Sequence, residues 1–208
     1  VFGKIAHAYT MKESVEDKIT VRIVYEGRAD KILLKNEKLK EIEDYYKKCS
    51  DEGSNEYQID ESKKAVTKMN VILGDPDRLK DLAIDFVNHY EKRIMEGASV
   101  LGKVMFVCSS RPIAYDFYKE IIELRPEWAK VKECDDNTTL TKQEKKELKP
   151  IEKVKMVMTR DKDDPKILYD LLGTKDYRKE LDRQFKNEKS NFKIAILVDM
   201  WLTGFDVP

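Results

Sequence analysis

The sequence predicts an α/β fold in which a parallel sheet is flanked by helices. After residue 100, short apolar runs at 103–108, 154–159 and 192–198 alternate with amphipathic stretches at 113–124 and 177–187. In the second stretch Tyr177, Leu181 and Phe185 are spaced by four, which predicts one apolar side of a helix. Strands that alternate with helices are typical of a parallel sheet. The first of these runs has no polar alternation, which predicts a strand buried on both faces.

The first hundred residues add a mainly helical region. A capping-box pattern at 10–13 (TMKE) predicts a short helix that reaches Asp17, and the β-branched run at 19–25 (ITVRIVY) predicts a strand. Apolar residues recur at helical spacing over 36–48, and 60–73 has a weaker pattern of the same kind.

The clearest helix of this region begins at Asp75 and Pro76, an N-cap residue followed by proline at the first helical position, and ends before Gly97. Its apolar residues share one face, which predicts packing against a core: Leu79, Leu82, Ala83, Phe86, Val87, Tyr90 and Ile94.

Composition narrows the class of protein. The 208 residues suit one domain of ordinary size, or one with an insertion. Lys and Arg together number 40, as do Asp and Glu, which excludes a polybasic nucleic-acid wrapper and an acidic tail. Any nucleic-acid contact is therefore expected to be local.

The sequence predicts neither a membrane segment nor a metal site. No apolar run approaches the ~20 residues that a membrane helix needs, and residues 1–10 lack the pattern of a secretion signal. We therefore expect a soluble, cytoplasmic protein. Cysteines and histidines are few and widely spaced, which argues against a zinc site or a disulfide framework: Cys49, Cys108, Cys134, His7 and His89.

One candidate site is the segment Ser109, Ser110 and Arg111, which follows the predicted strand at 103–108. Ligands of open parallel sheets bind beyond the carboxyl ends of the strands. The two hydroxyls and the guanidinium are suited to phosphate oxygens at a helix start. The alternative is a serine that caps the helix beside a surface arginine.

A second candidate site lies at 203–206, after the predicted strand at 192–198. Thr203 and Asp206 supply polar groups, and Gly204 lets another molecule approach the backbone. The alternative is a tight turn with an aspartate cap. No G-x-x-x-x-G-K-[ST] loop occurs in the sequence, so this chain alone cannot cradle a triphosphate in the usual way.

Other features favour structural explanations. His7 and His89 lack a Ser, Cys or Asp partner at motif spacing, and Cys108 lies in an apolar strand. Trp201 could stack on a base, but an aromatic residue beside a strand end more often packs. The polar stretch at 135–152 predicts a solvated insertion or mobile loop.

Residues 198–208 (VDMWLTGFDVP) resemble motif V of superfamily 2 helicases, in the form found in the R (restriction and motor) subunit of type I restriction enzymes. Residues 103–111 (KVMFVCSSR) resemble motif IV of that family. Residues 2–3 and 8–17 are similar to the segment that leads from the first motor domain into the second.

The resemblance implies a second RecA-like motor domain with an additional helical insertion region. Residues 1–98 would form the connecting segment and insertion, and 99–208 a partial RecA-like domain that stops before motif VI. The missing initiator Met and the end at Pro208, after a strand-and-loop pattern, are consistent with a piece of a larger protein.

In such motors ATP, with Mg2+, lies between two RecA-like lobes whose opening and closing moves them along duplex DNA. The resemblance places Gly204 and Asp206, with Thr203 as a further contact, at the nucleotide. It places the segment from Ser109 to Arg111 near the nucleotide or the DNA backbone. No catalytic residue and no metal ligand is expected in this chain, which alone should be inactive.

At two positions this chain differs from many superfamily 2 helicases, which limits the DNA-contacting roles that the resemblance implies. Many superfamily 2 helicases have a DNA-contacting threonine where this chain has Val198, and an arginine where it has Thr203.

Expected partners are double-stranded DNA and the methylation and specificity subunits of the restriction complex. The alternatives are a non-catalytic RecA-like interaction domain and a motor lobe of another superfamily 2 helicase.

Overall fold

The computed structural model describes the following residues: 9–19, 70, 72–97, 102–134, 138–202 and 205. The chain divides into two compact units, 1–31 and 32–208, which are considered separately. In the first, helix α1 (Met11–Glu16) carries the predicted capping box, in which the Thr10 side chain accepts from the Glu13 N–H. Most of the other elements predicted before residue 70 lie outside the described residues.

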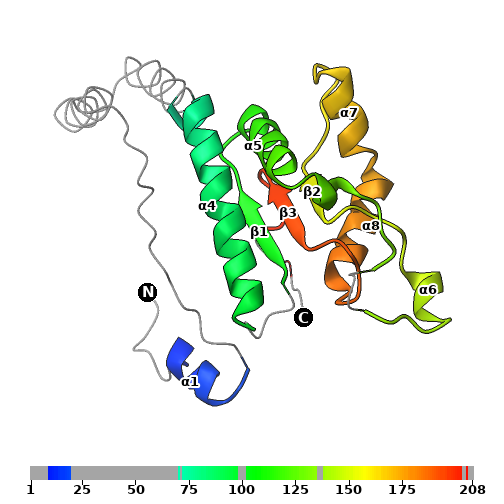
Figure 1. Ribbon diagram of the computed structural model, residues 1–208. Coiled ribbons are helices and arrows are strands. Elements are labelled where there is room, and N and C mark those ends of the chain that lie inside the picture. The colour runs from blue at the N-terminus through cyan, green and yellow to red at the C-terminus, as the bar shows by residue number, and fades with distance from the viewer. Residues whose placement is uncertain are drawn as a thin grey trace, which may run out of the picture. The chain divides into compact units, whose positions relative to one another are not determined.

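The second unit contains a three-stranded parallel sheet, which confirms the predicted fold class (Figure 1). Its strands are β1 (Val104–Val107), β2 (Val154–Val157) and β3 (Ile194–Leu197), in the order β1-β3-β2. Val104 and Val154 both pair with Ile194, so the strands are in phase and end level at one edge.

In this unit residues 70, 72 and 73 are helical, and six further helices are described from end to end: α4 (Pro76–Met95), α5 (Arg111–Leu124), the 3-10 helix η1 (Pro126–Ala129), α6 (Glu144–Glu147), α7 (Lys166–Leu172) and α8 (Lys175–Lys186). The sequence predicted α4, α5 and α8. It missed η1, α6 and α7, because helices of four to seven residues are too short to show an amphipathic period.

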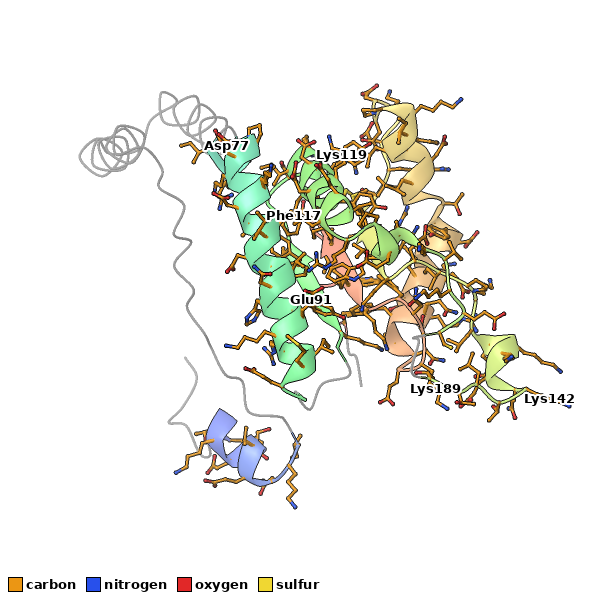
Figure 2. The ribbon with its side chains drawn as sticks, viewed as in Figure 1. Asp77, Glu91, Phe117, Lys119, Lys142 and Lys189 are labelled. Carbon is orange, nitrogen blue, oxygen red and sulfur yellow. The ribbon has the colours of Figure 1, made fainter. Side chains whose placement is uncertain are left out.

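Helices α4 and α5 pack together against one face of the sheet. Phe117 of α5 is fully buried, and its ring stacks on Phe106 of β1 with centroids 4.1 Å apart. Phe86 of α4 meets both rings edge-on, at 5.3 Å from Phe106 and 5.8 Å from Phe117. Figure 2 shows Phe117 between the two helices. This aromatic group joins α4, α5 and β1 into one core.

The opposite face of the sheet is covered by α8. Leu181 and Phe185, four residues apart on one side of the helix, pack with Ala195 and Leu197 of β3. Phe185 also contacts Phe192, with ring centroids 4.9 Å apart. The helical spacing read from the sequence therefore identified the buried side of α8.

The expectation that β1 is buried on both faces is wrong. Met105 and Val107 are 42% and 52% exposed, whereas β2 and β3 are buried throughout. β1 lies at the edge of the sheet, and among the described residues no helix covers its second face. An apolar run shows that both faces of a strand can be buried, but the covering elements decide whether they are.

The polar stretch at 135–152 was expected to be a solvated insertion or a mobile loop; where the structure describes it, most side chains are exposed, as in a solvated insertion, but two are buried. Leu148 and Ile151 are each only 5% exposed, and Ile151 forms a β-bridge with Lys132. Lys189 forms an ion pair with Glu144 of α6, with 2.6 Å between the atoms. Leu148 and Ile151 are only two apolar residues in a charged stretch, so composition alone does not predict that they are buried.

The predicted boundary between residues 98 and 99 stays a prediction. The structure adds that α4, which precedes this boundary, shares a core with α5, which follows it. No helix in the described part of the chain is long and apolar enough to cross a membrane.

Candidate functional site at the carboxyl edge of the sheet

Three loops meet at the carboxyl edge of the sheet. They follow β1 at 108–110, β2 at 158–165 and β3 at 198–202. Because the three parallel strands end level, the loops are held side by side. This edge is where open parallel sheets bind ligands.

The loop after β1 presents the predicted pair of serines. Ser109 is exposed, and Ser110 occupies the N-cap position of α5 in an extended conformation. The Ser110 side chain makes no capping hydrogen bond to α5. The alternative in which a serine side chain caps the helix is therefore not what the structure shows, and the hydroxyl is not used by its own helix.

Arg111 bridges two of the loops. Its Nη2 donates a hydrogen bond to Asp164, in the loop after β2, and the two side chains are 26% and 9% exposed. Asp164 also accepts from the backbone N–H of Asp161 at 2.6 Å. Partial burial alone would raise the pKa of Asp164, but these donors hold the pKa below its usual value. The pair thus fixes the loop after β2 against the start of α5.

The loop after β2 was missed as a site candidate. Thr159 is exposed, and the Arg160 guanidinium lies over the Tyr169 ring of α7, 4.2 Å from its centroid. Among the described residues, Arg160 has no carboxylate oxygen within 4.0 Å. Arg160 follows the predicted strand at 154–159 directly, and a basic side chain at the end of a predicted parallel strand is the signal that could have found it.

The loop after β3 has an unusual backbone. Asp199 and Trp201 have φ angles of 53° and 59°, in the left-handed region that residues other than glycine seldom adopt. Trp201 packs against Phe185 of α8, with ring centroids 5.5 Å apart, as the structural explanation predicted. Thr203, Gly204 and Asp206 lie outside the described residues, so their roles stay predictions.

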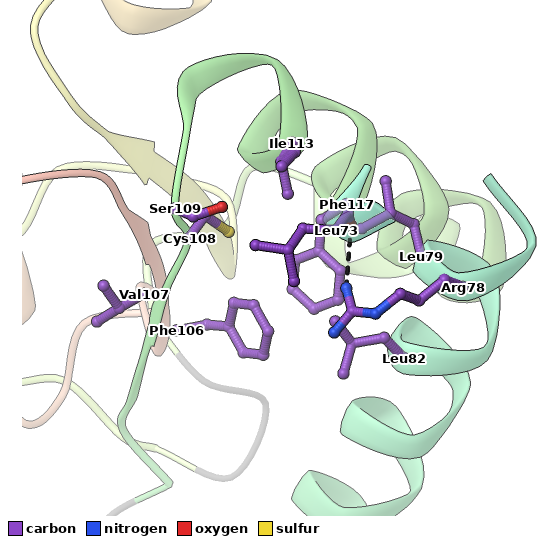
Figure 3. Close-up of a pocket in the computed structure, with 10 residues that line it drawn as sticks. All are labelled: Leu73, Arg78, Leu79, Leu82, Phe106, Val107, Cys108, Ser109, Ile113 and Phe117. Atoms are coloured by element: carbon purple, nitrogen blue, oxygen red, sulfur yellow. Dashed lines mark hydrogen bonds between the residues drawn. The ribbon is translucent and has the colours of Figure 1, made fainter. Parts of the chain in front are cut away.

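A cavity of about 280 Å³ lies between α4, β1 and α5, beside Ser109 (Figure 3). Arg78 enters it and donates from Nη1 to the Leu73 carbonyl at 3.0 Å. Cys108 also lines it, and burial raises the pKa of this thiol to about 12. The thiol is therefore protonated near neutral pH, which confirms Cys108 as a packed group and argues against a nucleophile.

In the described segments, the histidine, cysteine and acidic side chains form no second candidate site. There, no group of three or more His, Cys, Asp and Glu side chains is placed to hold a metal ion. His89 is partly buried on α4, whereas His7 and Cys49 lie outside the described residues.

Two family models match parts of the chain. The family described as type I restriction enzyme subunit R domain 3 matches residues 101–208, and the family described as SWI2/SNF2 ATPase matches residues 1–59. No solved structure matches significantly.

Two curated relatives match the chain over its full length. The type I restriction enzyme HindI endonuclease subunit of Haemophilus influenzae is 33% identical over 208 residues. The putative type I restriction enzyme MjaIXP endonuclease subunit of Methanocaldococcus jannaschii is 31% identical over 210 residues. The chain spans 17% of the length of each relative. With more than half of its residues matched by the domain 3 family, the chain belongs to the R subunits of type I restriction enzymes.

Proposed function

We propose that this chain is part of the ATP-dependent DNA translocase of a type I restriction endonuclease R subunit, acting on double-stranded DNA. The observation that carries the proposal is the convergence of three strand-end loops at one edge of a sheet, in a chain of this family. Such an edge suits phosphate groups, because hydroxyls, guanidinium groups and a helix start meet there.

The nucleotide is proposed to contact Gly204, Asp206 and Thr203, in the loop that resembles motif V. Ser109, Ser110 and Arg111 are proposed to contact phosphate, of DNA or of nucleotide. The hydroxyl of Ser110 is not used for capping, which leaves it available for such a contact. Asp164 engages Nη2 of Arg111 and so orients a guanidinium that has further donors.

A partial nucleotide site at this edge is supported by the serine hydroxyls and the Arg111 guanidinium that follow β1. The described residues include neither a phosphate-binding glycine loop nor a group of acidic side chains suited to Mg2+. We therefore propose that the other motor lobe of the full-length subunit holds most of ATP and Mg2+. When bound between the lobes, ATP supplies the free energy for movement. This chain alone should then be inactive, because phosphoryl transfer needs groups from both lobes.

The names of the relatives describe endonuclease subunits, and we propose the same enzyme class for the full-length protein that contains this chain. It would act as a site-specific deoxyribonuclease in the cytoplasm, together with methylation and specificity subunits. Its nuclease residues would lie outside this chain.

We expect ATP hydrolysis by the full-length subunit to rise when linear duplex DNA is added, and the 208-residue chain to stay at background under the same conditions. The measurement is steady-state phosphate release with and without duplex. A full-length subunit that binds partner subunits but never hydrolyses ATP would favour the non-catalytic interaction domain.

Arg111→Ala in the full-length subunit should weaken binding to all duplex sequences alike, because a contact to the DNA backbone is blind to sequence. The slope of log affinity against log salt should fall by about 0.9 for the lost phosphate contact. A salt titration of duplex binding measures both effects.

The matched variant for this experiment is Asp164→Asn, which removes the carboxylate charge beside Arg111 and retains the arginine. Its salt slope should stay that of the wild type. If Arg111→Ala also leaves the salt slope and the ATP affinity unchanged, Arg111 only joins the two loops and is not a phosphate contact.

A further inference from the structure

The loop after β3 is attached to α8 by stacked aromatic rings. The rings of Trp201 and Phe205 are parallel within 7°, with centroids 4.2 Å apart. Both rings also face Phe185 of α8, at 5.5 and 6.2 Å. Phe185 is 1% exposed and belongs to the core under α8, whereas Trp201 and Phe205 are only partly buried. The stack therefore connects a surface loop to a rigid part of the fold.

Two lysines border this stack. The Lys186 ammonium lies 4.9 Å from the centroid of Phe205 and 3.1 Å from an Asp182 carboxylate oxygen. The Lys103 ammonium lies 5.6 Å from the centroid of Phe185 and donates to the Phe185 backbone carbonyl. A cation near an aromatic ring adds an electrostatic attraction to the packing. These contacts hold the stack from α8 and from the start of β1.

The backbone conformation indicates that the stacked rings do more than bury apolar surface. Asp199 and Trp201 adopt left-handed φ angles, which are unfavourable for side chains larger than glycine. A tryptophan keeps such a conformation only where other contacts compensate for it, and the ring contacts with Phe185 and Phe205 are the ones observed. The stack therefore helps to hold Trp201 in this conformation as the chain leaves β3.

The two rings flank the proposed nucleotide loop. Thr203 and Gly204 lie in the sequence between Trp201 and Phe205, and Asp206 follows directly. We propose that Trp201 and Phe205 are positioning residues: by stacking on Phe185, they fix both sides of the segment that meets the nucleotide. The inference rests on the proposed function of that loop and assigns no contact with ATP to either ring.

The first test replaces Trp201 in the full-length subunit with leucine or phenylalanine. Trp201→Leu removes the ring and should lower kcat/KM for ATP on the order of tenfold, because small misplacement of a binding group is costly. Trp201→Phe keeps a stacking ring and should stay within about threefold of wild type. The matched control is Trp128→Phe, since Trp128 is buried in the core on the other face of the sheet and should leave kcat/KM unchanged.

The second test reads the position of the loop directly. The change in tryptophan emission on adding ADP should be larger in the wild type than in Trp201→Phe, because Trp201 reports on the loop. Phe205→Leu should also show a smaller change in tryptophan emission on adding ADP than the wild type. This readout does not depend on turnover, so it decides the matter even if Trp201→Leu lowers the melting temperature.

The outcomes separate this inference from the proposed function. A wild-type subunit without duplex-stimulated ATP hydrolysis contradicts the proposed function. An active wild type whose Trp201→Leu and Phe205→Leu variants keep full kcat/KM, with identical emission changes in wild type and Trp201→Phe, overturns the positioning role alone.

Discussion

Replacing Asp206 with asparagine should lower ATP turnover by the full-length subunit on the order of 100-fold, the size of effect seen when one group that stabilises the transition state is removed. The reason is the proposed position of this carboxylate at the nucleotide, one residue beyond the Phe205 ring that stacks on Trp201. KM and kcat measured with saturating duplex would show whether binding or turnover is affected.

The matched control is Asp199→Asn in the same loop. Asp199 has a φ of 53°, a conformation that asparagine also tolerates, so this change removes a charge without new strain. Turnover should then stay close to wild type. If Asp206→Asn instead unfolds the protein while activity per folded molecule persists, Asp206 is a structural cap of a turn and the nucleotide assignment is wrong.

The largest effect on stability is expected at Phe117. Phe117→Ala should cost about 3–5 kcal/mol in the free energy of unfolding, the range for removing a buried phenylalanine ring. Phe117 is fully buried and contacts Phe106 and Phe86, so the cavity would open where α4, α5 and β1 meet. Urea unfolding of the 208-residue chain, followed by circular dichroism, measures the loss.

A surface isoleucine provides the comparison. Ile167 of α7 is 72% exposed, and Ile167→Ala should change the unfolding free energy by no more than about 0.5 kcal/mol. A loss at Phe117 as small as that at Ile167 would contradict a shared core for α4 and α5.

Local patterns predicted the elements whose signals lie close together in the sequence. The cap at Asp75 and the spacing of Leu181 and Phe185 identified α4 and α8, because these features depend on neighbours within a few turns. The exposed second face of β1 could not be predicted in the same way. Whether Met105 is covered depends on helices placed elsewhere by the fold.

The candidate site shows the same limit. The serines after β1 were found because they follow an apolar strand directly. The ion pair of Arg111 with Asp164 joins residues 53 positions apart, and no local sequence pattern at either residue predicts the pairing. Likewise, the sequence placed Trp201 beside a strand end, but its left-handed backbone and its stack with Phe205 follow from packing on α8.

Movement along DNA is the central claim, and displacement of a third strand bound at a known distance on duplex DNA measures it most directly. With the full-length R subunit, its methylation and specificity subunits and ATP, the delay before displacement should grow in proportion to the distance. When ATP is withheld, the third strand should not be displaced at any distance. ATP hydrolysis with a delay that is independent of distance, or without any displacement, would contradict a translocase.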